Sequence, residues 1–563
     1  MSLTSPSRAG SDRRLEPDAG PDVDGWSPRP DDWWRHGVIY QIYPRSFADS
    51  NGDGVGDLAG ITAHLDHLND GTGRSLGIDA IWLSPFYPSP MADFGYDISD
   101  YRDIDPAFGT LADFDCLVAE AHARGIRVIV DLVPNHTSDR HPWFVESRSS
   151  RTNPRRDWYV WADPAPGGGP PNDWRSHFER IGPAWTYDER TGQYYLHSFH
   201  SRQPDLAWWN PQVRGAFEDI LRFWLDRGVD GFRIDVADRT VKVRDLTATR
   251  ALDQRVMLRG EPDRTPVVDE AATHELLKSW RRILDDYGGR MAVGEVATLD
   301  PEILVTFYGT GDELSLGFNF EFLHRRWSAA EFRASVDTIE ALLPAGSWPC
   351  YTLSNHDVSR HISRFGGPDR DLRARLAAMM LLTLRGTPFL YYGEEIGMAD
   401  VRIPPDRVVD VAGRDPERTP MQWSSGPGAG FTSGRPWLPI GDVTSGRTVE
   451  DESRDPRSLL SLYRRLIWYR RRSEALRAGT YRPLDVADPD VFAFLRDAPD
   501  GPRLVLLHFA ESSTRADLSA AGLGTRASIA VSTDPDRPAT DVSLDAVELG
   551  PDEGLILVPE ASS

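Results

Sequence analysis

A chain of 563 residues is too long for one ordinary hydrophobic core and indicates two or three domains. Its 86 acidic and 63 basic residues give a net charge of −23, a field that repels phosphate and argues against nucleic acid or anionic membranes as partners. The two cysteines, Cys116 and Cys350, lie in no CxxC motif, which argues against a zinc site or a disulfide framework. Because the N-terminus has no apolar signal region and no apolar run is long enough to span a bilayer, we expect a cytoplasmic protein.

Residues 1–30 are polar and rich in proline and glycine, and we expect a disordered tail there. From residue 31 onward, short apolar runs alternate with segments of helical periodicity. Strands that alternate with helices along the chain predict a parallel sheet. Eight such strand–helix units predict a closed (β/α)₈ TIM barrel. The expected strands are 37–43, 77–83, 127–133, 231–236, 291–296, 314–322, 350–353 and 388–392.

Two intervals depart from this repeat. Residues 137–205 are too many for a loop after the third strand and predict an inserted small domain. Residues 477–563 alternate apolar and polar side chains in short runs, which predicts a C-terminal antiparallel β-sandwich domain. The catalytic barrel would therefore consist of 31–136 and 206–476.

Polar residues gather where the predicted strands end. In a barrel of this kind the carboxyl ends of the strands form the mouth, and functional side chains lie there. Carboxylates crowded at one mouth push their pKa values apart, as acid/base chemistry requires, although a strand-end arginine and aspartate can also be a structural ion pair. The polar residues are Asp131, Asn135, His136, Arg233, Asp235, Glu295, His356 and Asp357.

Five short segments resemble the signature regions of the α-amylase family, glycoside hydrolase family 13. They read DLVPNH (131–136), QPDL (203–206), GFRID (231–235), GEV (294–296) and SNHD (354–357), and they occur in the family's order. Each is weak alone, but five in register identify the chain as similar to that family over roughly residues 36–480. The resemblance implies the same barrel and a glycosidase activity.

The resemblance also implies roles for three carboxyls. Asp235 would be the nucleophile that attacks the anomeric carbon, and Glu295 the acid/base that protonates the leaving oxygen. Asp357 would bind sugar hydroxyls and favour the distorted ring of the transition state. Such an enzyme retains the anomeric configuration, which requires the two reacting carboxyls to lie about 5–5.5 Å apart.

Three further side chains would serve the same sugar ring. Arg233 would keep Asp235 ionised and oriented, because a nearby cation lowers the pKa of a carboxyl. His136 and His356 would bind hydroxyls of the sugar at subsite −1.

Two more segments, GYDISDY (95–101) and GRDPERTPMQW (413–423), resemble the oligo-1,6-glucosidase and α-glucosidase branch of the family. In that branch an aspartate and an arginine close the pocket behind the terminal glucose, so that the enzyme removes one glucose from a non-reducing end. Of the two arginines we favour Arg414, and Arg418 would then anchor the loop. The substrate-binding candidates in these segments are Tyr96, Asp97, Arg414 and Arg418.

The glycine-rich segment 49–57 carries oxygen ligands at alternate positions, as hard cations prefer. The resemblance implies a structural Ca²⁺ or Mg²⁺ here, far from the chemistry. The alternative is an empty loop of Asx turns, since Gly60 stands where an EF-hand would have glutamate. The candidate ligands are Asp49, Asn51, Asp53, the Val55 carbonyl and Asp57.

Specificity is less determined than chemistry. Val236, directly after Asp235, resembles members of the branch that cleave α-1,6 links. The leading hypothesis is an exo-acting α-glucosidase for short α-1,4 or α-1,6 glucosides, acting as a monomer or small homo-oligomer on a disaccharide or oligosaccharide. A transglucosylase or sucrose isomerase would share every residue named. A non-catalytic carbohydrate-binding relative is disfavoured because Asp235, Glu295 and Asp357 are all present.

Overall fold

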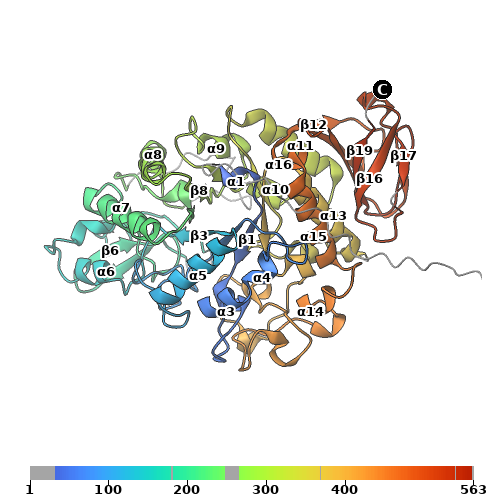
Figure 1. Ribbon diagram of the computed structural model, residues 1–563. Coiled ribbons are helices and arrows are strands. Elements are labelled where there is room, and N and C mark those ends of the chain that lie inside the picture. Colours follow the sequence, from blue (N-terminus) through green and yellow to red (C-terminus); the bar gives the residue numbers. More distant parts are fainter. Residues whose placement is uncertain (1–31, 179–181, 247–264, 368, 539, 561–563) are drawn as a thin grey trace, which may run out of the picture.

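The computed structural model describes residues 32–178, 182–246, 265–367, 369–538 and 540–560 (Figure 1). The predicted N-terminal tail, residues 1–30, lies outside the described residues.

A parallel eight-stranded barrel forms the centre of the molecule, as predicted. The strands are hydrogen-bonded in the order β10-β11-β1-β2-β3-β7-β8-β9, and a parallel bridge between Phe318 and Cys350 joins the first and last. The barrel is packed on both faces, and accordingly its strands are short and mostly apolar, and every strand residue except Arg127 is buried. The strands are β1 (Ile39–Ile42), β2 (Ala80–Leu83), β3 (Arg127–Leu132), β7 (Gly231–Ile234), β8 (Met291–Gly294), β9 (Leu316–Gly317), β10 (Cys350–Thr352) and β11 (Thr387–Tyr391).

Helices surround this barrel, and several begin at side chains that satisfy their first N–H groups. Thr110 and Asp113 form a capping box at the start of α5, and Asn210 caps α7, whose first residue is proline. The helices are α1 (Trp33–His36), α2 (Pro44–Phe47), α3 (Leu58–Ala63), α4 (Leu65–Leu68), α5 (Leu111–Ala123), α6 (Pro142–Ser147), α7 (Pro211–Asp226), α8 (Glu270–Asp286), α9 (Pro301–Thr306), α10 (Phe320–Leu323), α11 (Ala329–Leu342), α12 (His361–Phe365), α13 (Arg370–Thr383), α14 (Val449–Glu452), α15 (Leu459–Arg472) and α16 (Glu474–Ala478).

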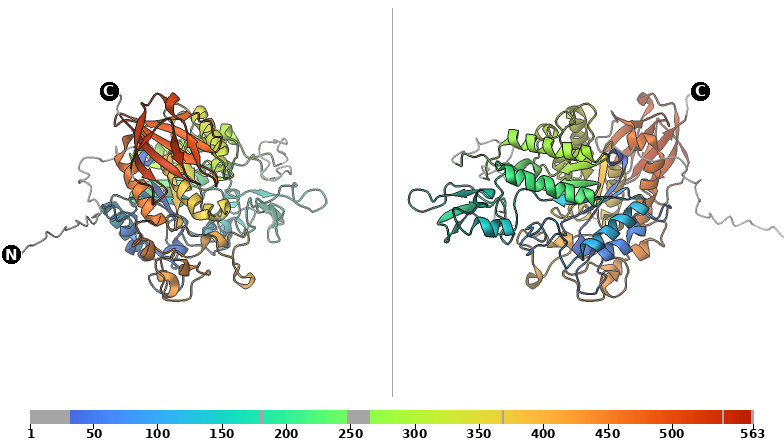
Figure 2. Two further views of the ribbon diagram at one scale, coloured as in Figure 1. Left: turned by 90° about the vertical axis from the view of Figure 1, so that its right-hand side faces the viewer. Right: turned by 60° about the vertical axis from the view of Figure 1, so that its left-hand side comes forward.

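The inserted segment after β3 has a small sheet of its own and projects from one side of the barrel (Figures 1 and 2). Its strands are β4 (Trp161–Ala162), β5 (Trp185–Asp188) and β6 (Gln193–Leu196), paired antiparallel in the order β4-β6-β5. Trp174 and Trp185 are buried in its core, so these two aromatics serve packing.

The C-terminal residues form two antiparallel sheets on the opposite side of the molecule (Figure 2). The larger runs β12-β13-β14-β19-β16-β17 and the smaller β15-β18. Helix α13, buried from Ala374 to its end, packs against them, and it approaches so closely that a Cβ on Gly554 would lie 2.7 Å from the sulfur of Met379. The strands are β12 (Thr480–Leu484), β13 (Val491–Asp497), β14 (Arg503–His508), β15 (Thr514–Ala516), β16 (Arg526–Ser532), β17 (Asp541–Ser543), β18 (Val547–Leu549) and β19 (Gly554–Pro559).

Among the described residues, no helix combines the length and apolar character needed to cross a membrane. Both cysteines are free thiols.

Candidate active site

The polar residues predicted at the barrel mouth do converge. In the parallel register of β3 and β7, Asp131 lies beside Arg233, and the chain then delivers Asp235 just past the end of β7. Glu295 directly follows β8, the neighbour of β7 on its other side. Strand pairing therefore sets these four side chains next to one another.

A single guanidinium joins the three carboxyls. Arg233 Nη1 donates to Asp131 Oδ1 and to Asp235 Oδ1, each at 2.6 Å, and its Nη2 donates to Glu295 Oε2 at 2.5 Å. The guanidinium is buried, whereas the side chains of Asp235 and Glu295 keep 10% and 16% of their exposure. The predicted pair of Arg233 and Asp235 is thus present, and it extends to the second catalytic candidate.

Burial is the largest influence on the pKa values of Asp235 and Asp131. Burial raises the pKa of Asp235 well above its usual range; Glu295 and Asp131 act in the same direction, and Arg233 opposes them. Burial likewise raises the pKa of Asp131 to about 6, against the attraction of Arg233. Arg233 thus lowers the pKa of Asp235, as expected of a nearby cation, but burial outweighs it; the role of Arg233 in keeping Asp235 ionised stays a prediction. Burial and mutual repulsion thus favour the protonated forms of Asp235 and Asp131, while Arg233 favours their ionised forms.

Asp357 faces the opposite electrostatic environment. Its Oδ1 accepts from Arg414 Nη1 at 2.9 Å and from Arg418 Nη2 at 2.8 Å. Burial would raise the pKa of Asp357, but His356 and the two arginines outweigh burial and hold it well below the usual range. Asp357 is therefore an ionised carboxylate, and its side chain is 30% exposed at the mouth.

His356 is neutral and fixed in one tautomer. Burial holds its pKa well below the usual value. Gln41 Nε2 donates to His356 Nδ1 at 2.8 Å, so the remaining imidazole proton lies on Nε2, which is 2.6 Å from the Tyr96 hydroxyl. The ring stacks on that of Tyr96, and the Tyr96 hydroxyl donates to Asp131 Oδ2 at 3.3 Å. Its predicted contact with sugar hydroxyls stays a prediction.

His136 lies on the other side of Tyr96. Its Nε2 is 3.2 Å from the Tyr96 carbonyl and 3.0 Å from Gln203 Nε2, and burial lowers its pKa to about 4. Gln203 also donates to Asp93 Oδ2 at 2.9 Å. The QPDL segment thus links His136 to a carboxylate that the sequence did not single out.

Asp93, and not Asp97, meets the arginine of the second branch-specific segment. Arg414 Nη2 donates to Asp93 Oδ1 at 2.6 Å. The Asp97 carboxylate is inaccessible and instead accepts from Ser89 Oγ and from the backbone N–H groups of Ala92 and Asp93, each at 2.9 Å. The Asp97 carboxylate therefore holds its own loop in shape, and its predicted contact with the terminal glucose stays a prediction.

The structure separates the two candidate arginines. Arg414 spans from Asp93 to Asp357 and Asp410, and its side chain is 14% exposed. Arg418 is inaccessible, and its Nε donates to the backbone carbonyl of His356 at 2.6 Å. This geometry agrees with our preference for Arg414 as the arginine that faces the pocket.

Val236 has a strained backbone. Its φ of 38° and ψ of 51° lie in the left-handed region, which a β-branched residue rarely adopts. In this conformation its N–H donates to Glu295 Oε2 at 3.2 Å, while the N–H of Ala237 donates to the Glu295 carbonyl at 2.8 Å. The residue after the candidate nucleophile thus contacts the candidate acid/base.

A buried lysine, which no sequence motif singled out, joins the inserted segment to the barrel. Lys242 Nζ lies 3.2 Å from Asp205 Oδ2, donates to the Arg239 carbonyl at 2.7 Å and bonds to Asn135 Oδ1. Its rarity was the one available signal, since the chain has only one other lysine, Lys278.

The predicted cation loop turns its oxygens toward its own N–H groups. Asp49 accepts from three loop N–H groups and from the Thr432 hydroxyl, and these bonds lower its pKa despite partial burial. Asp57 caps α3 through Gly60 N–H and accepts from Ser50. Within the described part of the chain, no three His, Cys, Asp or Glu side chains are gathered as a metal site. The ligand set is thus anionic and rich in oxygen, but it is not drawn together, and the cation stays a prediction. The candidate ligands remain Asp49, Asn51, Asp53, the Val55 carbonyl and Asp57.

Comparisons with known proteins point to one family. The family described as "Alpha amylase, catalytic domain" matches residues 41–479. A probable alpha-glucosidase of Rhizobium meliloti (strain 1021) is 46% identical over 474 residues, which are 80% of this chain and 84% of that protein. An oligo-1,6-glucosidase of Parageobacillus thermoglucosidasius is 40% identical over 523 residues, 85% and 91% of the two chains. A solved alpha-glucosyl transfer enzyme superposes with a TM-score of 0.85 at 40% identity, over 94% of this chain and 99% of its own.

Proposed function

The chain belongs to the α-amylase family and is thus a glycoside hydrolase. We propose that it is a retaining, exo-acting α-glucosidase that releases glucose from short α-1,4 or α-1,6 glucosides. The observation that carries the proposal is the contact of Arg233 with both Asp235 and Glu295. One rigid guanidinium sets the nucleophile and the acid/base side by side, as double displacement requires.

The first step forms a covalent glucosyl-enzyme. Asp235 Oδ attacks the anomeric carbon, the glycosidic C–O bond breaks, and Glu295 gives its proton to the departing oxygen. In the second step Glu295 takes a proton from water, the water oxygen bonds to the anomeric carbon, and the bond to Asp235 breaks. Two inversions retain the α configuration.

The loop arginine supports the exo mode. Arg414 ties Asp93 to Asp357, and these two carboxylates would bind the sugar hydroxyls farthest from the scissile bond. Such a bridge would close the pocket behind one terminal glucose. His136, His356 and Tyr96 would bind the same ring.

A disaccharide panel tests the proposal. Maltose, isomaltose, sucrose, trehalose, kojibiose and nigerose would be incubated with the protein, and products identified by chromatography and by NMR of the first-formed anomer. Because the proposed mechanism retains configuration, we expect the first glucose released to be the α anomer. Inversion to β-glucose, or an Asp235→Asn variant that keeps more than a few per cent of the activity, would contradict the proposed chemistry.

Glucosyl transfer is the second candidate, favoured by the match to the alpha-glucosyl transfer enzyme. Transfer differs only in which hydroxyl attacks the glucosyl-enzyme. Product analysis at rising substrate concentration decides between the two: trisaccharides or isomerised disaccharides that exceed free glucose would indicate a transferase.

We also propose that the 49–57 loop holds a structural Ca²⁺ or Mg²⁺. The ionised Asp49 and the neighbouring oxygens of Asn51 and Asp53 support this. Excess chelator should lower the melting temperature, and re-addition of the cation should restore it; an unchanged melting temperature would contradict the proposal. We further propose that the protein is cytoplasmic, which cell fractionation tests. We also propose that it is a monomer or a small homo-oligomer, which light scattering tests.

A further inference from the structure

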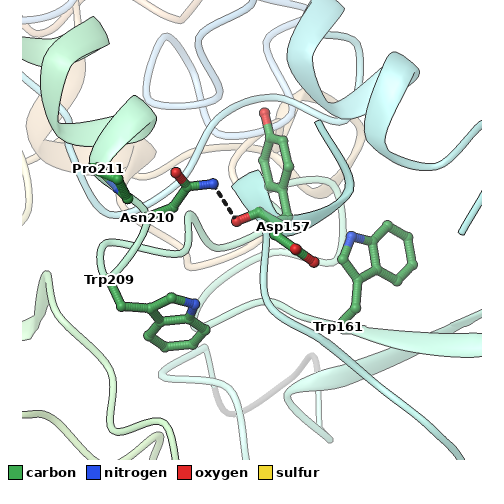
Figure 3. A pocket seen from close by; sticks show the side chains of 6 residues that line it. Asp157, Trp161, Trp209, Asn210 and Pro211 are labelled. Carbon is green, nitrogen blue, oxygen red and sulfur yellow. Dashed lines mark hydrogen bonds between the residues drawn. The ribbon is translucent and has the colours of Figure 1, made fainter. Parts of the chain in front are cut away.

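A pocket of about 390 Å³ lies where the inserted segment meets the start of α7 (Figure 3). Six residues from two short stretches line it: Asp157, Tyr159, Trp161, Trp209, Asn210 and Pro211. None of them belongs to the carboxyl cluster of the barrel mouth or contacts Arg233 or Arg414. Its volume falls in the range of small-ligand sites.

The two walls are fixed to each other. Asn210 Nδ2 donates to the backbone carbonyl of Asp157 at 2.9 Å, while the Asn210 side-chain oxygen accepts from the N–H of Gln212 at the start of α7 (Figure 3). The Tyr159 hydroxyl lies 2.7 Å from that of Thr137. These polar groups are therefore already used, and they hold the pocket open in one shape.

Two polar groups at the pocket are not used in this way. The Asp157 carboxylate is exposed and accepts no hydrogen bond from any residue that the structure describes. The indole N–H of Trp209 likewise finds no acceptor among the described residues. One strong acceptor and one donor are thus available to a ligand.

The two tryptophans differ in how they are held. Trp161 is clamped: the Arg156 guanidinium lies 3.4 Å from its ring centroid, the Phe144 ring is parallel to it, and its N–H donates to Ser147 Oγ. Trp209 is half-buried against the small core of the inserted segment and has no ring stacked on it among the described residues. Trp209 can thus receive the apolar face of a flat ligand, while Trp161 forms a rigid opposite wall (Figure 3).

We propose that this pocket binds one glucosyl unit of an α-linked oligosaccharide, at a place separate from the site of cleavage. The pyranose C–H face would pack on Trp209, and its hydroxyls would donate to Asp157. The chain's net charge of −23 and the free carboxylate disfavour an anionic ligand. The choice of a glucosyl unit rests on the proposed function.

The test is calorimetric titration of the full-length Asp235→Asn protein, which does not turn over, with isomaltotriose and with maltotriose. We expect two binding events per chain. Adding Trp209→Ala should remove the second event or weaken it about tenfold, and Asp157→Ala should do the same. Tyr187, a 47% exposed aromatic on β5, provides the matched control, and Tyr187→Ala should keep both events. Circular dichroism would verify that each variant is folded.

Two other outcomes overturn the inference in distinguishable ways. If the number and strength of binding events are the same with and without Trp209→Ala and Asp157→Ala, the pocket is not a sugar site, and the proposed function stands. If the Asp235→Asn protein binds neither trisaccharide, the proposed function fails, and this inference fails with it.

Discussion

Asp93 and Arg414 form an ion pair of 2.6 Å across the mouth of the barrel, between the loop after β2 and the loop after β11. The aspartate four residues later in the chain, Asp97, is buried in its own loop and pairs with no arginine among the residues that the structure describes. Two carboxylates in one short motif therefore have different tasks, and substitution separates them.

Replacing Asp93 should damage activity and spare the fold. Asp93→Asn removes a charged contact that would bind sugar, while Arg414 keeps Asp357 and Asp410. We expect kcat/KM for the preferred disaccharide to fall roughly 100-fold, equivalent to about 3 kcal/mol, with the melting temperature nearly unchanged.

Replacing Asp97 should do the reverse. Asp97→Ala leaves two N–H groups and one hydroxyl without an acceptor in a buried loop, at a cost of about 3 kcal/mol of unfolding free energy. Thermal unfolding and kinetics on both variants provide the measurement. If Asp97→Ala unfolds like the parent and only its kcat/KM falls, the two roles have been exchanged.

Val236 should influence linkage preference. Its N–H donates to Glu295, and it directly follows the candidate nucleophile Asp235 in the chain. Val236→Thr keeps the β-branched shape, and thus the strained backbone, but adds a hydroxyl. We expect the ratio of kcat/KM for isomaltose over maltose to fall by about 10-fold or more, since one subsite contact is worth roughly 1–3 kcal/mol.

The parent protein must prefer isomaltose for that expectation to hold. A parent with a strong maltose preference contradicts it before any variant is made. An unchanged ratio in Val236→Thr would show that the linkage is selected elsewhere.

Glu394 should make stability depend on pH. It lies in the core, where Tyr463 Oη donates to it at 3.2 Å and the N–H of Tyr391 at 3.3 Å. The nearby charged or titratable groups are Arg360, Glu395, Tyr463 and His361, whose Nδ1 lies 3.8 Å away. Burial raises its pKa to about 8. The folded state therefore keeps a proton that the unfolded chain releases near pH 4.5, and stability falls as pH rises between these two values.

Glu394→Gln removes the titration and keeps the shape of the side chain: its one amide oxygen can accept from the Tyr391 N–H, and its NH₂ group then faces the Tyr463 hydroxyl, which can turn to accept from it. Calorimetric melting at pH 5 and pH 8 should show a smaller drop in the variant than in the parent, by roughly a few kcal/mol in unfolding free energy. Equal drops in the two proteins would show that Glu394 does not carry the effect.

The sequence predicted what depends on periodicity and on strand ends. Alternating strands and helices located the barrel, and the strand ends located Arg233, Asp235 and Glu295. It did not predict which acidic residue of the loop after β2 faces the pocket. That depends on left-handed backbone at Phe94 and Gly95, with φ of 46° and 110°, which turns the chain between Asp93 and Asp97.

Burial was the other property beyond the sequence. The raised pKa of Asp235 follows from how completely neighbouring strands exclude water, which no local motif encodes. Lys242 was missed for the same reason, because its partners Asp205 and Asn135 reach it from distant parts of the chain.

Lys242 should therefore be a strong determinant of stability at the junction between the inserted segment and the barrel. Its ammonium and the Asp205 carboxylate are both inaccessible, so removing one charge leaves the other buried without compensation. Lys242→Met should cost about 3–5 kcal/mol of unfolding free energy. Asp205→Asn in the same chain should recover part of that loss, since the neutral amide keeps an acceptor for the Ser198 N–H and carries no unpaired charge.

Thermal melting of the two single variants and the double variant gives the coupling free energy between Lys242 and Asp205 directly. Losses that simply add would mean that the two charges do not stabilise each other, whatever their distance.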